Sequence, residues 1–405
     1  MEQQRIAGAS GFWGVASAFG VTMAGTTLPT PLYPLLQRDF GFGEPTSTAL
    51  YAIYAGGVVV ALVLFGRTSD VIGRRRVLLA GLACAALSAV AFLGATGLSG
   101  LFLGRVLSGL SAGMVTGTAT AALGELHPRG DRARAALVAT VANVLGLGCG
   151  PLLSGVLATV APAPLHLPFL VHLVLLVPAA LAVWRAPEPV RRDPGVRVRI
   201  ERPALPVEVR PVFVPAATAM FAVFAVFGLV TAVEPSFLVQ LLGVRSPLVP
   251  AAVVFAMFAG SAAGQVASRG LPTTRALSVG CAVILVGVGG FAAALAVGSA
   301  VLLAAATVVV GGGQGVAFRG AVAAIGARAP SHQRAATMSS FFIVVYAGIS
   351  VPVVLAGAAS TRWGLEASGL AFTAGVALLI VVALIATATG VRRTATGASA
   401  AGRGR

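Results

Sequence analysis

Three residues that are charged at neutral pH lie several positions inside long apolar stretches of this sequence, where a charge is expensive to keep. They are Arg105, Glu234 and Arg319. A charged side chain at the centre of a lipid bilayer costs about 2.5–3.5 kcal/mol even on the lenient insertion scale. Each is therefore expected to face a cavity or a polar partner, where it can carry a proton or bind a charged group.

Glu234 lies near the outer end of the apolar stretch at residues 211–238. It is the candidate proton carrier, because it is the only acid within an apolar stretch on that side of the membrane. The alternative is an interfacial glutamate at the membrane edge. Arg319 also has two interpretations. It binds an anionic substrate or a carboxylate, or its long side chain extends to the aqueous surface. The same extension is the alternative for Arg105.

The elements that position these residues are predicted to be membrane-spanning helices. The 405 residues are 57% hydrophobic and 10% charged, with a mean hydropathy of +0.94, whereas a soluble domain carries about 25% charged residues. Apolar windows of about 20 residues can cross about 30 Å of hydrocarbon as helices. Twelve such windows follow one another, at residues 11–36, 47–66, 77–96, 99–124, 135–160, 166–185, 211–238, 247–268, 276–296, 299–325, 335–359 and 365–390.

The distribution of arginine predicts the orientation. The net charge of +16 would suit a nucleic-acid partner, but cytoplasmic loops of membrane proteins also collect positive charge. With the N-terminus inside, 23 of the 28 basic residues fall in cytoplasmic segments. We therefore predict a multi-pass protein of the plasma membrane with both termini in the cytoplasm, no nucleic-acid partner and a lipid bilayer as its surroundings.

The two halves of the chain are similar to each other. Gly109, Gly113, Pro128 and Arg132 recur at a constant offset of 202 as Gly311, Gly315, Pro330 and Arg334. Between the halves lies the longest polar interruption. The predicted units are an N-terminal six-helix bundle at 1–185, a cytoplasmic linker at 186–210, a C-terminal six-helix bundle at 211–390 and a cytoplasmic tail at 391–405.

A charged loop at residues 66–76 carries four arginines and one aspartate between two apolar segments. Its pattern, Gly66-x-x-x-Asp70-x-x-Gly73-Arg74-Arg75-Arg76, resembles the signature loop between the second and third helices of the major facilitator superfamily. The resemblance implies an all-α integral membrane fold. In that fold, two six-helix bundles are related by a pseudo-two-fold axis, with the substrate site between them.

The resemblance also implies that this loop is a gating latch on the cytoplasmic side. Asp70 would pair with Arg74 or another arginine and accept hydrogen bonds from helix N-termini. Glycine would let two helix ends approach closely. The alternatives are a loop that only sets topology and, for Glu125, a solvated loop acid. The predicted latch residues are Gly66, Asp70, Gly73, Arg74, Arg75 and Glu125.

Two further motifs are similar to patterns of the same superfamily. Arg105-x-x-x-Gly109-x-x-x-Gly113 implies a role for Arg105 in proton transfer or in anchoring an anion. The other resembles the antiporter motif of the fifth helix, although Ser154 stands where that motif has glycine, and helix packing alone is the alternative. Its residues are Gly146, Gly150, Pro151, Ser154 and Gly155.

No nucleotide-binding loop, metal-ligand cluster or nucleophile–base pair stands out, so we predict neither an enzyme nor a cofactor. The favoured function is a monomeric secondary transporter that exports a small apolar or amphiphilic compound, a drug or a metabolite, in exchange for protons. The alternatives are a nutrient symporter or facilitator, and a membrane sensor that does not transport.

Overall fold

The protein is helical, with no strand, throughout the part of the chain that the structure describes. The computed structural model describes residues 2–65, 68–190, 204–330 and 333–401. Gly66 of the predicted latch and residues 191–203 of the predicted linker lie outside these ranges. The long helices are α1 (Glu2–Thr27), α3 (Glu44–Phe65), α5 (Arg74–Leu93), α6 (Leu98–Leu126), α7 (Arg132–Val160), α8 (Leu167–Arg185), α9 (Arg210–Ala232), α11 (Leu248–Ala267), α12 (Thr273–Val297), α13 (Ala300–Arg328) and α14 (Arg334–Ala401).

These helices supply the predicted spans. Ten stretches of the described chain are helical, long and apolar enough to cross a membrane. One of them, within α14, is really two helices, because Gly364 has φ 81° and ψ 165° and breaks the helical conformation. Glycine reaches this positive φ without the steric penalty of a Cβ atom. With α1 added, the count agrees with the twelve apolar windows of the sequence.

The helices of the first and seventh spans end earlier than the hydropathy predicts. The windows at 11–36 and 211–238 continue past the ends of α1 at Thr27 and α9 at Ala232. Proline cannot donate the backbone hydrogen bond that continues a helix, and prolines follow both helix ends. The chain instead forms short segments there: η1 (Thr30–Leu32) and α2 (Tyr33–Phe40), then α10 (Glu234–Ser236) and the π-helical turn η2 (Phe237–Leu241).

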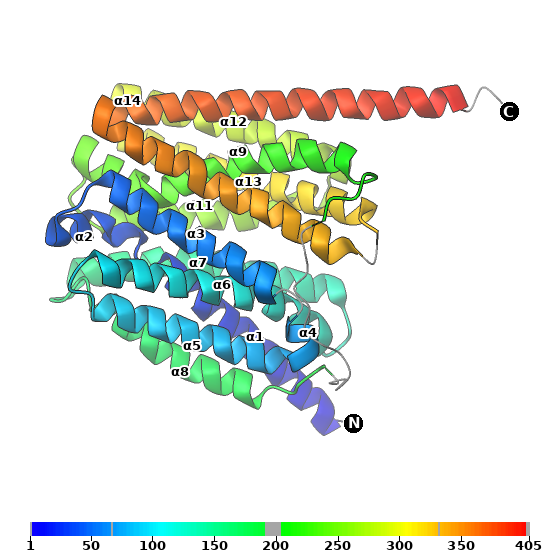
Figure 1. Ribbon diagram of the computed structural model, residues 1–405, viewed down its shortest axis with the longest axis horizontal. Helices are drawn as coiled ribbons and strands as arrows, with labels where there is room; N and C mark the ends of the chain where they lie inside the picture. Colours follow the sequence, from blue (N-terminus) through cyan, green and yellow to red (C-terminus); the bar gives the residue numbers. More distant parts are fainter. Residues whose placement is uncertain (1, 66–67, 191–203, 331–332, 402–405) are drawn as a thin grey trace.

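The helices form two groups that lie side by side (Figure 1). Helices α1, α3, α5, α6, α7 and α8 pack on one another in the first bundle. Helices α9, α11, α12, α13 and α14 do so in the second. The bundles meet where α7 packs on α11 and α3 packs on α14. Both chain ends lie at one end of the bundles (Figure 1), here called the terminal end, and the opposite end is called the α2 end.

Glycines allow equivalent helix pairs to approach closely in both bundles. A Cβ atom on Gly109 of α6 would lie 2.1 Å from the Tyr54 carbonyl oxygen of α3. A Cβ atom on Gly311 of α13 would lie 2.2 Å from the Met257 carbonyl oxygen of α11. Both distances are far inside van der Waals contact, so the duplicated glycines mark duplicated contacts between backbones.

We therefore expect Gly109→Ala to destabilise the protein, by about 1–3 kcal/mol as for other overpacked cores. The matched control is Gly117→Ala, two turns along the same helix, where a Cβ atom meets nothing within 4 Å. That control should be neutral or stabilising by up to about 1 kcal/mol. Thermal unfolding in detergent measures both, and equal unfolding temperatures for the two variants would contradict the proposed backbone contact.

Candidate functional site

Arg74 contacts several polar side chains of the charged loop and of α6 at the terminal end. Its Nε and Nη2 donate to the two carboxylate oxygens of Glu125 in α6, at 3.2 and 2.9 Å. Nη1 donates to Ser69 Oγ at 2.6 Å and forms an ion pair with Asp70 in the short helix α4 (Thr68–Ile72). The Arg74 side chain is only 10% exposed, so two carboxylates stabilise a largely buried charge. We call Ser69, Asp70, Arg74 and Glu125 the Arg74 cluster.

Gly73 and Glu188 complete the loop. The Glu188 carboxylate accepts the backbone N–H groups of Arg74 and Arg75 at 2.9 and 3.1 Å, and it therefore caps the first turn of α5. A Cβ atom on Gly73 would lie 2.5 Å from Glu188 Oε2, and Gly73 has φ 104°. The second glycine of the motif is needed on both counts. Arg75 reaches the Trp184 carbonyl oxygen at 3.2 Å.

A polar network joins the two bundles at the α2 end. Gln240 Nε2 of η2 donates to Gln37 Oε1 of α2 at 3.3 Å and to Glu44 Oε1 of α3 at 3.5 Å. Gln37 Nε2 in turn donates to Glu44 Oε1 at 2.7 Å and to Ser47 Oγ at 2.8 Å. We call Gln37, Glu44, Ser47 and Gln240 the Gln240 network. It links groups 196 or more residues apart in the sequence, from opposite bundles.

Arg105 points into the first bundle and is 1% exposed, so it does not extend to the surface. Its Nη1 donates to the Thr26 carbonyl oxygen at 2.8 Å, and its Nη2 donates to the Tyr33 hydroxyl. The guanidinium also lies 5.4 and 5.7 Å from the ring centres of Tyr33 and Tyr54. A cation is favourable at the C-terminus of α1, where backbone carbonyls lack helical partners. These contacts explain how the charge is accommodated.

Glu234 is fully buried at the first position of α10. The Thr307 hydroxyl of α13 lies 2.9 Å from Glu234 Oε1 and also 2.9 Å from the Leu303 carbonyl oxygen. Glu234 Oε2 has no hydrogen-bond partner among the described residues. The ion pairs of the described residues do not include Glu234. The structure thus places this acid beside a hydroxyl rather than beside a cation.

Arg319 supports the loop after α11. Its Nε donates to Ser268 Oγ at 2.9 Å, and its Nη2 donates to the Leu271 carbonyl oxygen at 3.0 Å. Ser268 lies 198 positions after Asp70, the same offset that separates Gly66 from Gly264. Arg319 is thus held by a serine hydroxyl and a carbonyl oxygen, whereas Arg74 in the first bundle is held by two carboxylates. Arg319 and Glu234 are not brought together.

The antiporter-like motif of α7 packs on two neighbours. Cβ atoms on Gly146 and Gly150 would lie 2.5 and 2.1 Å from carbonyl oxygens of α1. Gly155 faces the other bundle, where a Cβ atom would lie 2.2 Å from Ala251 Cβ of α11. Ser154 is buried and its hydroxyl lies 3.1 Å from the Pro151 carbonyl oxygen of its own helix. The motif thus joins α1 to the bundle interface.

A cavity of about 550 Å³ opens at the terminal end, where α6 and α7 meet. Its lining includes Thr120, Glu125 and Arg132. Beside it, the Asp131 carboxylate accepts the backbone N–H of Arg134 at 3.0 Å, and this hydrogen bond lowers the pKa of Asp131. The close contacts between bundles lie further toward the α2 end, as at Gly155 and at Gly357, which abuts Thr48 of α3.

Several site residues were not among those predicted from the sequence. Glu44 precedes the second apolar window, and Gln37 and Gln240 are neutral residues of short segments, so none of them stood out as a buried ionisable group. Glu188 falls within the predicted linker at 186–210, and nothing in the sequence distinguishes it from the other acids of that segment. One signal was available in the sequence. Gly73 precedes a helix that begins with arginines, and a glycine there leaves space for a carboxylate to accept the first backbone N–H groups, but the sequence does not indicate which acid does so.

Comparisons with known proteins identify the family. A sequence model of the Major Facilitator Superfamily matches residues 15–351, so the chain belongs to this superfamily. A bacterial homologue of the human lysosomal transporter Spinster, solved in an inward-facing and unoccupied conformation, has the same fold. The TM-score is 0.73 at 15% identity, over 95% of this chain and 98% of that one.

Curated relatives match a smaller part of the chain. The tetracycline resistance protein of class H from Pasteurella multocida is 30% identical over 162 residues, which cover 38% of this chain and 39% of that protein. An uncharacterised transporter of the same superfamily type from Mycobacterium tuberculosis is 32% identical over 142 residues, 35% of this chain and 20% of that protein. The chain thus spans well under half the length of either relative.

Together, the family match and the fold define the class of protein. The chain is a multi-pass membrane protein of the Major Facilitator Superfamily, whose members are transporters and not enzymes. This confirms the fold class and the superfamily predicted from the charged loop and the twelve apolar windows.

We expect Asp70→Asn to fold and insert but to transport slowly. The change removes the ion pair between Asp70 and Arg74 and leaves both hydrogen bonds from Arg74 to Glu125. Transport is measured in vesicles at equal expression. Asp39→Asn, which removes an exposed acid at the α2 end, is the control and should match wild type. A wild-type rate for Asp70→Asn would mean that the loop only sets topology.

We also expect Gln240→Leu to loosen the α2 end. A hydrogen bond contributes about 0.5–1.5 kcal/mol, which corresponds to a shift of about twofold to tenfold toward an open α2 end. The reporter is Thr48→Cys in a background without the native cysteines, because Thr48 is fully buried against α14. A membrane-impermeant maleimide should label it faster in Gln240→Leu.

The control for this experiment is Gln265→Leu, the same chemical change near the terminal end of α11. It should leave the labelling of Cys at position 48 unchanged. If Gln240→Leu also leaves that rate unchanged, the Gln240 network does not hold the α2 end closed.

Proposed function

We propose that the protein is a proton-coupled exporter of a small apolar or amphiphilic compound that works by alternating access. The moving units are the first bundle, residues 1–185, and the second, residues 211–390, joined by the linker at 186–210 and followed by a tail at 391–405. In this proposal the terminal end lies in the cytoplasm, the α2 end lies outside the plasma membrane, and a monomer is sufficient.

The environment of Glu234 carries the proposal. Thr307 has a single hydroxyl proton and two oxygens at 2.9 Å, Glu234 Oε1 and the Leu303 carbonyl oxygen. The hydroxyl can donate this proton to either oxygen, so at most one neutral hydrogen bond stabilises the Glu234 carboxyl among the described residues. A carboxylate would be left buried with an unpartnered oxygen and no cation, and this is costly. A group that must be neutral when buried and can ionise when hydrated is suited to exchange protons.

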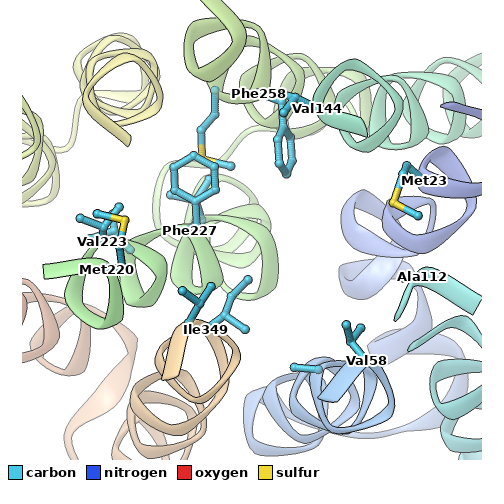
Figure 2. Close-up of a cluster of buried hydrophobic side chains, with 14 of the residues drawn as sticks. Met23, Val58, Ala112, Val144, Met220, Val223, Phe227, Phe258 and Ile349 are labelled. Carbon is cyan, nitrogen blue, oxygen red and sulfur yellow. The ribbon is translucent and has the colours of Figure 1, made fainter. Parts of the chain in front are cut away.

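The region between the bundles is apolar, which supports an apolar or amphiphilic substrate. Phe227 of α9 and Phe258 of α11 pack edge to face, with ring centres 5.7 Å apart. Phe224 and Phe318 are partly buried, with ring centres 5.9 Å apart. Figure 2 shows buried apolar side chains of both bundles around this region: Met23, Val58, Ala112 and Val144 of the first, and Phe227, Phe258 and Ile349 of the second, with Met220 and Val223 further from the first bundle.

The direction of transport is proposed from the relatives. They include tetracycline resistance proteins, whose names describe resistance to a drug, and this favours export over uptake. The structure is compatible with either direction: the Gln240 network joins the bundles at the α2 end, and the cavity of about 550 Å³ at the terminal end is lined by α6, α7 and the loop between them.

A growth screen and a vesicle assay test the function. An efflux-deficient bacterium that expresses the chain should grow at higher concentrations of at least one compound in a panel of amphiphilic toxins that includes tetracycline and ethidium. Everted vesicles should then accumulate that compound when their lumen is acidified. Accumulation only in right-side-out vesicles would instead identify an importer.

We expect Glu234→Gln to abolish accumulation driven by the pH gradient while substrate exchange continues. The glutamine amide keeps the size of the side chain and can still bond to Thr307, but it cannot release a proton. Glu366→Gln, which changes an exposed acid in the second half of α14, is the matched control and should behave as wild type. Undiminished uphill transport by Glu234→Gln would exclude this residue as the proton carrier.

A further inference from the structure

Glu44 is a second buried acid, placed where the two bundles meet. It is the first residue of α3 and is 8% exposed. Its polar neighbours come from both bundles: Gln37 from the first, and Gln240 and Ser236 from the second. Because its surroundings are assembled from two bundles, they exist only while the α2 end is closed.

The hydrogen bonds of Glu44 divide sharply between its two oxygens. Oε1 accepts from Gln37 Nε2 at 2.7 Å and from Gln240 Nε2 at 3.5 Å. Oε2 is buried and, among the described residues, no hydrogen bond with good geometry reaches it or the Ser236 hydroxyl, although that hydroxyl is close enough to interact with the carboxyl. A neutral carboxyl group has one carbonyl oxygen that accepts and one hydroxyl that donates. A proton on Oε2 would fit this division and supply a donor for Ser236.

Among the described residues, no cation is placed to balance an ionised Glu44. The groups that face it from α2, α3, α10 and η2 are amides and hydroxyls, and the nearest acid along the chain from Ser236 is the buried Glu234. The ion pairs of the described residues do not include Glu44. The other charged residues near this end are exposed: Arg38, Asp39, Arg245, Arg362 and Glu366.

We propose that Glu44 is a second proton-binding site and that the α2 end closes only over its protonated form. In the open state water would hydrate the carboxylate. Closure removes that water and offers no cation in exchange, so the charged form opposes closure. A proton taken up by Glu44 from the α2 side therefore favours the closed state.

This site has a different role from Glu234. The contacts of Glu44 lie at the α2 end, so its proton returns to the same side when that end reopens. Glu44 therefore adjusts the balance between open and closed states to the acidity outside and carries no proton across. The inference rests on the alternating access of the proposed function, but not on Glu234 being the proton carrier.

The Thr48→Cys reporter tests the inference without any substrate. Labelling by an impermeant maleimide is measured between about pH 5 and about pH 8. Carboxyl groups that are buried without a cation lose their proton in this range. Each rate is divided by that of Arg38→Cys, an exposed position at the same end, which corrects for the reagent's own pH dependence. The ratio should rise severalfold with pH in otherwise wild-type protein and stay low and flat in Glu44→Gln.

Two further variants make each result decisive. Glu44→Asp keeps a carboxyl and should keep the pH dependence, which preserves the test if Glu44→Gln does not insert. Glu234→Gln should also keep it. A pH-independent ratio in wild type, or an unchanged pH dependence in Glu44→Gln, would overturn the inference. A pH dependence lost only in Glu234→Gln would overturn it as well and assign the response to Glu234. The vesicle assays, by contrast, can fail while this inference holds.

Discussion

An unpaired charge inside a lipid-embedded helix bundle is unfavourable, and this constraint governs the polar chemistry of the transporter. Arg74 satisfies it with two carboxylates, and Arg105 does so with the carbonyl at the end of α1 and two tyrosine rings. Glu44 and Glu234 have no cation among their described partners. The two arginines thus have acidic, carbonyl or aromatic partners, whereas the two buried acids lack a cation among the described residues. Proton coupling is proposed from this difference.

Close packing of backbones holds the charged groups in place. The duplicated glycines bring α6 onto α3 and α13 onto α11, and those of α7 bring it onto α1. Such contacts make each bundle rigid, because a shift of either helix would separate or overlap main chains. The interface between the bundles combines apolar side chains, close glycine contacts at Gly155 and Gly357, and the hydrogen bonds of the Gln240 network. Motion between whole bundles requires these contacts to separate while each bundle keeps its own.

The sequence predicted the long helices and the fold because lipid imposes one simple rule on composition and length. It also predicted a pairing of Asp70 with Arg74 or another arginine, since one motif holds these residues, and it left Glu125 open between this cluster and a solvated loop acid. It placed the ends of α1 and α9 too far along, because a hydropathy window does not respond to the missing N–H groups of prolines. It did not identify Glu44 or Glu188, because both are ordinary acids in sequence. Their partners come from distant segments: Gln240 of η2 reaches Glu44, and Glu188 reaches the start of α5.

Spin-label distances between the bundles test the central claim, that two rigid bundles exchange a closed α2 end for a closed terminal end. One pair of labels would be placed at Arg38 and Leu241, at the α2 end, and another at Arg129 and Arg328, on exposed sites at the terminal end. A third pair, at Arg76 and Arg129, lies within the first bundle. The account predicts that the α2-end distance lengthens as the terminal-end distance shortens when the pH is raised, while the third distance stays constant. A change in the distance within the bundle, or inter-bundle distances that do not change in opposite directions, would contradict it.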